Sequence, residues 1–148
     1  MIGEIGTDLL NRVRSVPSLA SSTSFAIGGK ATDPALKTIP LPACRLLFMN
    51  MYADEDPRST GSSRGGGMVP ADQVVIFDFR ALLIVPYLDD TDILTVEFPL
   101  LNAVVDAIKD TSVPTASGHR WRLLSQKLSF VYPDRLGFEQ RYTIDAVL

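Results

Sequence analysis

The sequence predicts an α+β domain in which an antiparallel or mixed β-sheet carries two helices packed on one face. Two observations support this prediction. Apolar residues recur at helical spacing in two segments, and runs rich in β-branched and aromatic residues indicate strands elsewhere. The resulting order of helix, strands, helix and hairpin is typical of a sheet covered by helices on one side. Residues 1–148 have the length of one domain and contain no internal repeat, so a single domain is expected.

The first predicted helix occupies residues 2–16. Apolar side chains follow one another there at intervals of three or four residues, which places them on one face of a helix. Glu4 lies near the predicted start and Arg12 and Arg14 lie near the predicted end, which is the distribution that the helix dipole favours. Pro17 should end the helix, because proline cannot supply the amide hydrogen that a further turn needs.

Few regular elements are expected between this helix and the middle of the chain. Residues 21–29 are short enough for an edge strand. Residues 30–43 contain three prolines, which exclude a regular central strand, so this segment is predicted to be a connecting loop. Residues 44–52, with the sequence CRLLFMNMY, are predicted to form a strand.

A long polar segment, residues 53–72, follows that strand. From position 54 to position 72 its sequence is DEDPRSTGSSRGGGMVPAD, which is too polar for a core. A connection of about 19 residues is usually either functional or disordered. We therefore predict a flexible loop of the β-hairpin type.

Residues 73–85 form the strongest predicted strand. Alternation places one set of apolar residues on the core face, namely Val75, Phe77, Phe79, Ala81 and Leu83. The opposite face carries Asp78 and Arg80 beside apolar side chains. A face that is apolar but charged at its middle is expected where a sheet meets a partner.

The second predicted helix covers residues 89–110. Asp90 and Thr91 are its N-cap candidates, and apolar residues recur at helical spacing after them. Pro99 should either kink this helix or mark the start of a second one, because proline removes one backbone hydrogen bond.

Two final strands are predicted at residues 120–132 and 137–148, joined as a hairpin. In the last strand Glu139 and Arg141 fall on the face opposite the core-facing residues. Trp121 at the start of the hairpin is expected to pack in the core rather than to stack on a ligand.

No motif in the chain identifies a reaction. His119 is the only histidine, and without a G-x-S-x-G motif we expect it to be a loop residue rather than a catalytic one. Gly61 and Gly66 have the spacing of a phosphate-binding loop, but residues 67–68 lack the required lysine and hydroxyl. The single cysteine, Cys44, is expected to be a buried packing residue. We therefore predict no catalytic, cofactor or metal site.

Composition favours protein partners over nucleic acid or membrane. The formal net charge is −3, whereas sequence-independent phosphate binding needs concentrated lysine and arginine. The longest apolar runs are far shorter than the roughly 20 residues that span a bilayer. The N-terminus carries acidic residues where a signal peptide has a basic flank, so synthesis inside the cell is expected.

The order and pattern of these segments resemble the tail terminator, or tail-completion, proteins of tailed bacteriophages. The resemblance covers most of the chain and is carried mainly by VVIFDFRALLIVPYLDD, by VEFPLLNAVVDAIKD and by LSFVYPDRLGFEQRYTIDAVL. Members of that family form a six-membered ring on the head-proximal end of the tail tube. The ring stops tube polymerisation and offers the surface to which the head connector attaches.

The resemblance implies a structural virion protein that is not an enzyme and needs no cofactor. Its implied partners are further copies of itself in a hexameric ring, the tail tube protein, the head–tail connector or neck protein and, in a contractile tail, the sheath. Its implied location is the head-proximal end of the virion tail, after assembly in the host cytoplasm. The candidate subunit or tube interface residues are Arg58, Arg64, Met68, Asp78, Arg80, Glu139 and Arg141.

Three alternatives remain open at this stage. The chain is alternatively another head–tail connector, neck or tail-tube protein, a small enzyme or ligand-binding domain, or an unrelated adaptor. Each candidate charge is alternatively an ordinary solvated side chain, because an isolated surface ion pair contributes little free energy.

Overall fold

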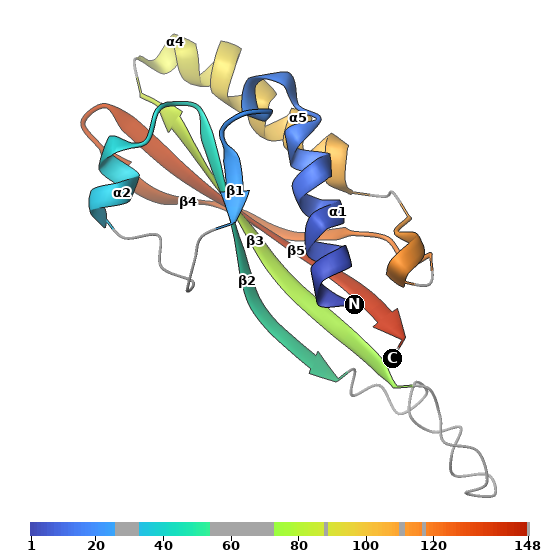
Figure 1. Cartoon of the computed structure of the whole chain (residues 1–148). Coiled ribbons are helices and arrows are strands. Elements are labelled where there is room, and N and C mark those ends of the chain that lie inside the picture. The colour runs from blue at the N-terminus through green and yellow to red at the C-terminus, as the bar shows by residue number, and fades with distance from the viewer. Residues whose placement is uncertain (26–32, 54–72, 88, 110–111, 117, 148) are drawn as a thin grey trace, which may run out of the picture.

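The computed structural model has five strands in one mixed sheet, with helices packed against it, which confirms the α+β class (Figure 1). The sheet order is β1-β2-β3-β5-β4. The residues that the structure describes are 1–25, 33–53, 73–87, 89–109, 112–116 and 118–147.

Three of the four strand pairings are antiparallel, namely β2–β3, β3–β5 and β5–β4, and only β1 and β2 pair in parallel. The strands are β1 (Thr23–Phe25), β2 (Ala43–Ala53), β3 (Val74–Pro86), β4 (Arg122–Tyr132) and β5 (Arg135–Val147). Because β2 and β3 are antiparallel neighbours, the connection between them is of the hairpin type, as predicted. The interior of that connection, 54–72, lies outside the described residues.

Two helices, α1 and α5, lie on the same face of the sheet, as predicted (Figure 1). The helical elements are α1 (Ile2–Arg14), η1 (Pro17–Leu19), α2 (Asp33–Thr38), α4 (Asp90–Asp92), η4 (Ile93–Glu97), α5 (Phe98–Ile108) and η5 (Pro114–Ala116). The apolar stripe of α1 buries Ile5, Leu9 and Val13 against the sheet. Ile2, which the spacing places on the same face, is exposed at the end of the helix.

The main core lies between these helices and the sheet. Phe79 is near its centre and makes edge contacts with the rings of Phe25, Phe48 and Trp121. Trp121 is fully buried, as predicted, and its indole nitrogen donates a 3.0 Å hydrogen bond to Asp8 of α1. This bond satisfies the one polar atom of the indole ring and ties the start of the hairpin to the first helix.

A buried polar network joins α5 to the sheet. The Gln140 side chain on β5 is fully buried on the core face, and its amide donates to the backbone carbonyl of Leu101 and to Gln126. The hydroxyl of Tyr142 donates to the Gln140 oxygen at 2.6 Å. Because the Gln140 amide and carbonyl are both paired, this polar residue is accommodated on the core face without an unpaired group.

Cys44 is buried in β2 and packs in the main core, which confirms that it is a packing residue. Burial raises the pKa of its thiol to about 12, against a smaller opposite effect from the charge of Arg45. The thiol therefore stays protonated near neutral pH.

The prediction of a loop for residues 30–43 was wrong in part, because α2 lies within it. Leu36 of α2 is buried with Leu82 and Ile84 of β3, on the sheet face opposite α1. Phe130 and Tyr132 from the final hairpin also pack against this second cluster. Proline is tolerated in the first turn of a helix, so Pro34 does not prevent α2 from forming.

The segment between β3 and α5 changes its helix type along its length. Asp89 is the N-cap, and its side chain accepts a 2.8 Å hydrogen bond from the amide of Asp92, so the predicted candidates, Asp90 and Thr91, were wrong by one and two residues. The turn η4 is a π-helix, and α5 begins immediately after it with Pro99 in its first turn. Of the two predicted outcomes at Pro99, the start of a further helix is the one observed.

Candidate assembly surfaces

Two of the predicted interface residues, Asp78 and Arg141, form a two-pronged ion pair on the sheet face opposite α1. Nε of Arg141 lies 3.1 Å from both carboxylate oxygens of Asp78, and a terminal nitrogen lies 2.8 Å from one of them. The hydrogen bond to Asp78, followed by its charge, raises the pKa of Arg141. Asp78 is only 4% exposed, so this pair is a fixed part of the sheet.

The other two predicted charges on this face also pair with each other. Arg80 donates to Glu139 at 3.1 Å, and Lys127 of β4 lies 3.8 Å from the same carboxylate. Nε of Arg80 is buried and has no hydrogen-bond partner among the described residues. These contacts connect β3, β5 and β4 across the face.

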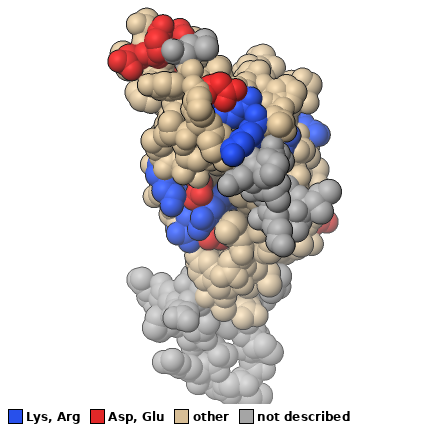
Figure 2. All heavy atoms as spheres, turned by 90° about the vertical axis from the view of Figure 1, so that its left-hand side faces the viewer, with Lys and Arg blue, Asp and Glu red and all other residues tan. Residues whose placement is uncertain are grey.

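The structure therefore brings together four of the seven predicted interface residues, all within one chain. Figure 2 shows lysine and arginine atoms with acidic atoms among them across the middle of one side of the molecule. Their use between subunits remains a prediction. The other three, Arg58, Arg64 and Met68, lie outside the described residues.

The second sheet face is less available to a partner than its sequence suggests. The apolar side chains beside Asp78 and Arg80 were expected to leave this face partly apolar at the surface, but α2 and the final hairpin bury Leu82 and Ile84. The sequence pattern of β3 alone does not reveal this cover, because it comes from residues far away in the chain.

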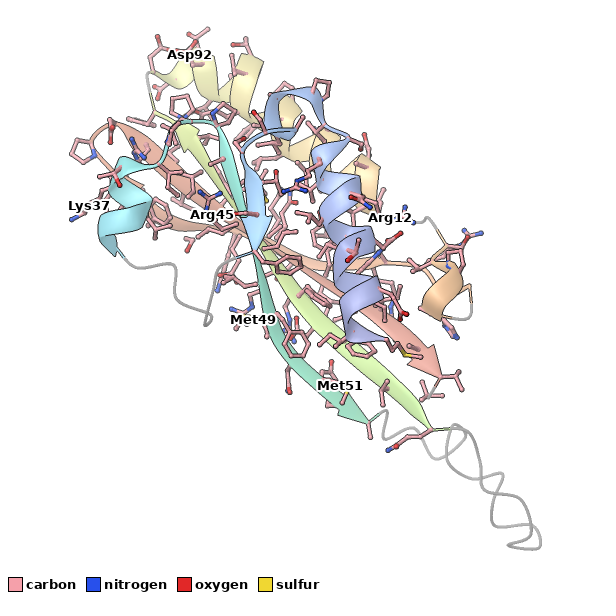
Figure 3. All side chains as sticks on the ribbon, viewed as in Figure 1. Arg12, Lys37, Arg45, Met49, Met51 and Asp92 are labelled. Atoms are coloured by element: carbon pink, nitrogen blue, oxygen red, sulfur yellow. The ribbon has the colours of Figure 1, made fainter. Side chains whose placement is uncertain are left out.

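The first open surface is the lower edge of β2. Strand β1 pairs only with Cys44–Leu46, so from Leu47 to Ala53 β2 has β3 as its single neighbour among the described strands. Large apolar side chains are exposed along this segment, as Figure 3 shows for Met49 and Met51. Met51 is 47% exposed.

The second open surface is β4, the opposite border of the sheet. Its 11 residues pair with β5 on one side, and no described strand lies on the other. Three of its apolar side chains, Leu124, Leu128 and Val131, are each more than half exposed. An edge strand with apolar side chains is a template for pairing with another chain.

The sequence pattern did not single out Met51 or Leu128 as exposed border residues. From sequence alone, an apolar residue in a strand is expected to lie in the core. Only the strand order shows whether its strand is at an open border of the sheet. The available signal was the run LLSQKLSFV, whose apolar residues do not keep a strict alternation. The register shifts between Leu123 and Ser125 and again between Leu128 and Phe130, which changes the face that each residue occupies.

The remaining sequence expectations concern small sites. His119 lies in the connection between η5 and β4, as predicted, with its backbone hydrogen-bonded to Val113 and Ala116. Among the described residues, no group of three or more histidine, cysteine, aspartate or glutamate side chains is placed to hold a metal ion. No helix in the described part of the chain has the length and apolar character needed to cross a membrane.

No protein-family model matches the chain, and no curated protein matches it.

Proposed function

We propose that this chain is a structural protein of a tailed bacteriophage particle that closes into a ring and caps the head-proximal end of the tail tube. The ring ends tube polymerisation and presents the surface for head–tail joining. The observation that supports a ring most directly is the pair of open, apolar borders on opposite sides of one sheet.

A ring needs a heterologous contact, in which one patch of each subunit meets a different patch of the next subunit. The lower edge of β2 and the free edge of β4 are two such patches. Strands β2 and β4 run in opposite directions within the sheet, because three successive antiparallel pairings separate them. When copies are related by rotation about a ring axis, β4 of one copy therefore meets β2 of the next in antiparallel orientation.

The two borders are not level with each other. The open part of β2 pairs with β3 residues 75–80. Strand β4 pairs with the part of β5 that itself pairs with β3 residues 78–86, so the two borders are offset along the strand direction. Neighbouring copies that pair these borders are therefore displaced along the strand direction. In a closed ring this displacement is accommodated by tilting the strands relative to the ring axis, as in a barrel.

The middle of the sheet is suited to transmit such contacts without deforming. Strands β3 and β5 stay in register over 13 residue pairs, and the Asp78–Arg141 and Arg80–Glu139 pairs join the same two strands. Each copy would thus present its two borders at a fixed separation and angle, which is what ring closure requires.

The proposal is tested by measuring both association and tube capping. Native mass spectrometry across a concentration series should show a ring-sized species, with a hexamer expected from the family resemblance. Tube protein assembled with this chain should give shorter tubes, as measured by negative-stain microscopy. Filaments that contain this chain along their length would instead indicate a tail-tube protein, and a monomer that leaves tube length unchanged would contradict the proposal.

A further inference from the structure

A pocket lies where β3 ends, between the helical segment η4–α5 and the turn η1. Its volume is about 220 Å³. It is lined by Ser18, Pro42, Val85, Pro86, Val96, Glu97 and Leu100. Ser18 and Val96 are exposed, so the pocket reaches the surface of the molecule.

Glu97 is the only ionisable residue among the described residues of this lining, and it is almost completely buried. Its exposed fraction is 1%, and neither carboxylate oxygen has a hydrogen-bond partner among the described residues. Burial raises the pKa of Glu97, and the nearby charge of Asp92 raises it further. A buried carboxylate without a partner is rare in folded proteins, because removing its charge from water is unfavourable.

The backbone around Glu97 is also unusual. Glu97 is the last residue of the π-helix η4, and α5 begins at the next residue. Single π turns are uncommon and occur frequently at functional sites. Here the π turn places Glu97 inward against the end of the sheet while its neighbour Val96 remains 54% exposed.

The chemistry of the lining selects the ligand. Its walls are almost entirely apolar, which suits an alkyl chain, and the Glu97 carboxylate suits a positively charged hydrogen-bond donor. A water molecule takes up about 30 Å³ in the liquid, so the pocket has room for roughly seven groups of that size. An unbranched chain of four carbons with a charged nitrogen group fits this space.

We propose that this pocket binds an alkylammonium or alkylguanidinium group, with the alkyl chain against Val85 and Leu100 and the charged end at Glu97. A lysine or arginine side chain of a second copy and a free alkylamine share this chemistry. The site does not depend on the ring proposal, because its lining includes neither the open part of β2, residues 47–53, nor any residue of β4.

The test uses n-butylammonium and n-butylguanidinium as probes, with n-butanol as the neutral probe of similar length. Binding is followed by backbone amide NMR shifts of Val85, Val96 and Leu100. We expect saturable shifts with both cations and weaker binding of n-butanol. Glu97→Gln keeps the side-chain shape but removes the charge, and should weaken binding of the cations about tenfold or more.

Glu4→Gln is the matched control, because it makes the same chemical change on the exposed surface of α1. It should leave cation binding unchanged. Equal cation affinity in wild type and Glu97→Gln, or the absence of shifts at the three pocket residues, would overturn the proposal. Far-ultraviolet circular dichroism of both variants establishes that they are folded.

A second measurement identifies the source of the cation, once cation binding at Glu97 has been observed. Native mass spectrometry compares wild type and Glu97→Gln, each with and without n-butylammonium. If a second copy supplies a lysine or arginine, both the substitution and the amine reduce self-association. If neither the substitution nor the amine reduces self-association, the cation comes from a free amine or from another protein. The pocket is then still a cation site, as proposed.

Discussion

The central strands and the border strands of this sheet differ in how completely they are covered. Strand β3 is buried on both faces over much of its length, with Phe77 and Phe79 in the main core and Ile84 in the second cluster. Strand β4 is exposed at most positions, including the apolar Leu128. Stability should therefore depend on the centre of the sheet and association on its borders, and the two can be changed separately.

The largest expected effect is on the central side. Phe79→Ala removes a fully buried ring that contacts three other aromatic rings, so the free energy of unfolding should fall by about 3–5 kcal/mol. Denaturant unfolding followed by circular dichroism measures this change. Phe98→Ala, at a position that is 43% exposed, should cost less than about 1 kcal/mol. Similar losses for the two variants would remove the contrast between centre and surface.

The next effect separates a structural ion pair from a surface one. Asp78→Asn leaves Arg141 without its two-pronged partner, and the free energy of unfolding should fall by about 2–3 kcal/mol. Asp145→Asn breaks the more exposed pair with Arg122 and should cost under about 1 kcal/mol. If Asp78→Asn preserves stability but prevents association, the pair has a role between subunits after all.

A gain in stability is expected when Glu97, a second buried carboxylate, is replaced by an apolar residue. Asp78 has an arginine partner, whereas Glu97 has none among the described residues, so Glu97→Met should raise the free energy of unfolding by about 1–2 kcal/mol near neutral pH. Thermal unfolding in the absence of amines measures this gain. A loss of stability would show that Glu97 has a partner in solution.

The raised pKa of Glu97 also predicts that the stability of the protein depends on pH. The pKa of Glu97 is raised in the folded protein, so between the ordinary glutamate pKa and this raised value the folded state binds more protons than the unfolded state. The stability of the wild type should therefore fall, relative to Glu97→Met, as the pH rises through this window. Below the window the two should differ least. A difference that shrinks with rising pH would contradict the assigned direction.

The smallest effect on stability is expected at the borders. Met51→Lys on β2 and Leu128→Lys on β4 place a charge on exposed positions, so each should change the free energy of unfolding by no more than about 0.5 kcal/mol. Each should nevertheless block strand pairing with a neighbour. Leu94→Lys, at a position that is 65% exposed on η4, is the matched control and should leave association unchanged.

The sequence predicts the covered parts of this fold better than the open ones. The periodicity of α1 and β3 reports burial directly, so the core face of β3 and the packing of both helices on one side are recovered. The helix α2 was missed because its six residues lie among prolines, and one buried residue, Leu36, is the only anchor among its described side chains and shows no periodicity.

The candidate sites were less predictable, for physical reasons. The sequence pattern identified the four charges on β3 and β5. Their pairing within one chain depends on the strand register, which places Asp78 opposite Thr143 and Arg80 opposite Arg141. Which strands form the open borders depends on the strand order, and the alternation of apolar and polar residues does not reveal that order. The environment of Glu97 depends on a π turn and on residues outside its own helical segment, from η1 and β3, and the periodicity of the sequence does not report these contacts.

The most direct test of assembly through the sheet borders is native mass spectrometry of Met51→Lys and Leu128→Lys, alone and mixed, beside the wild type. Each variant keeps one intact border, so a β2–β4 contact predicts monomers of each alone and a one-to-one pair in the mixture, where the wild type forms a ring. Rings formed by either variant alone, or a mixture that stays monomeric while the wild type assembles, would contradict the account.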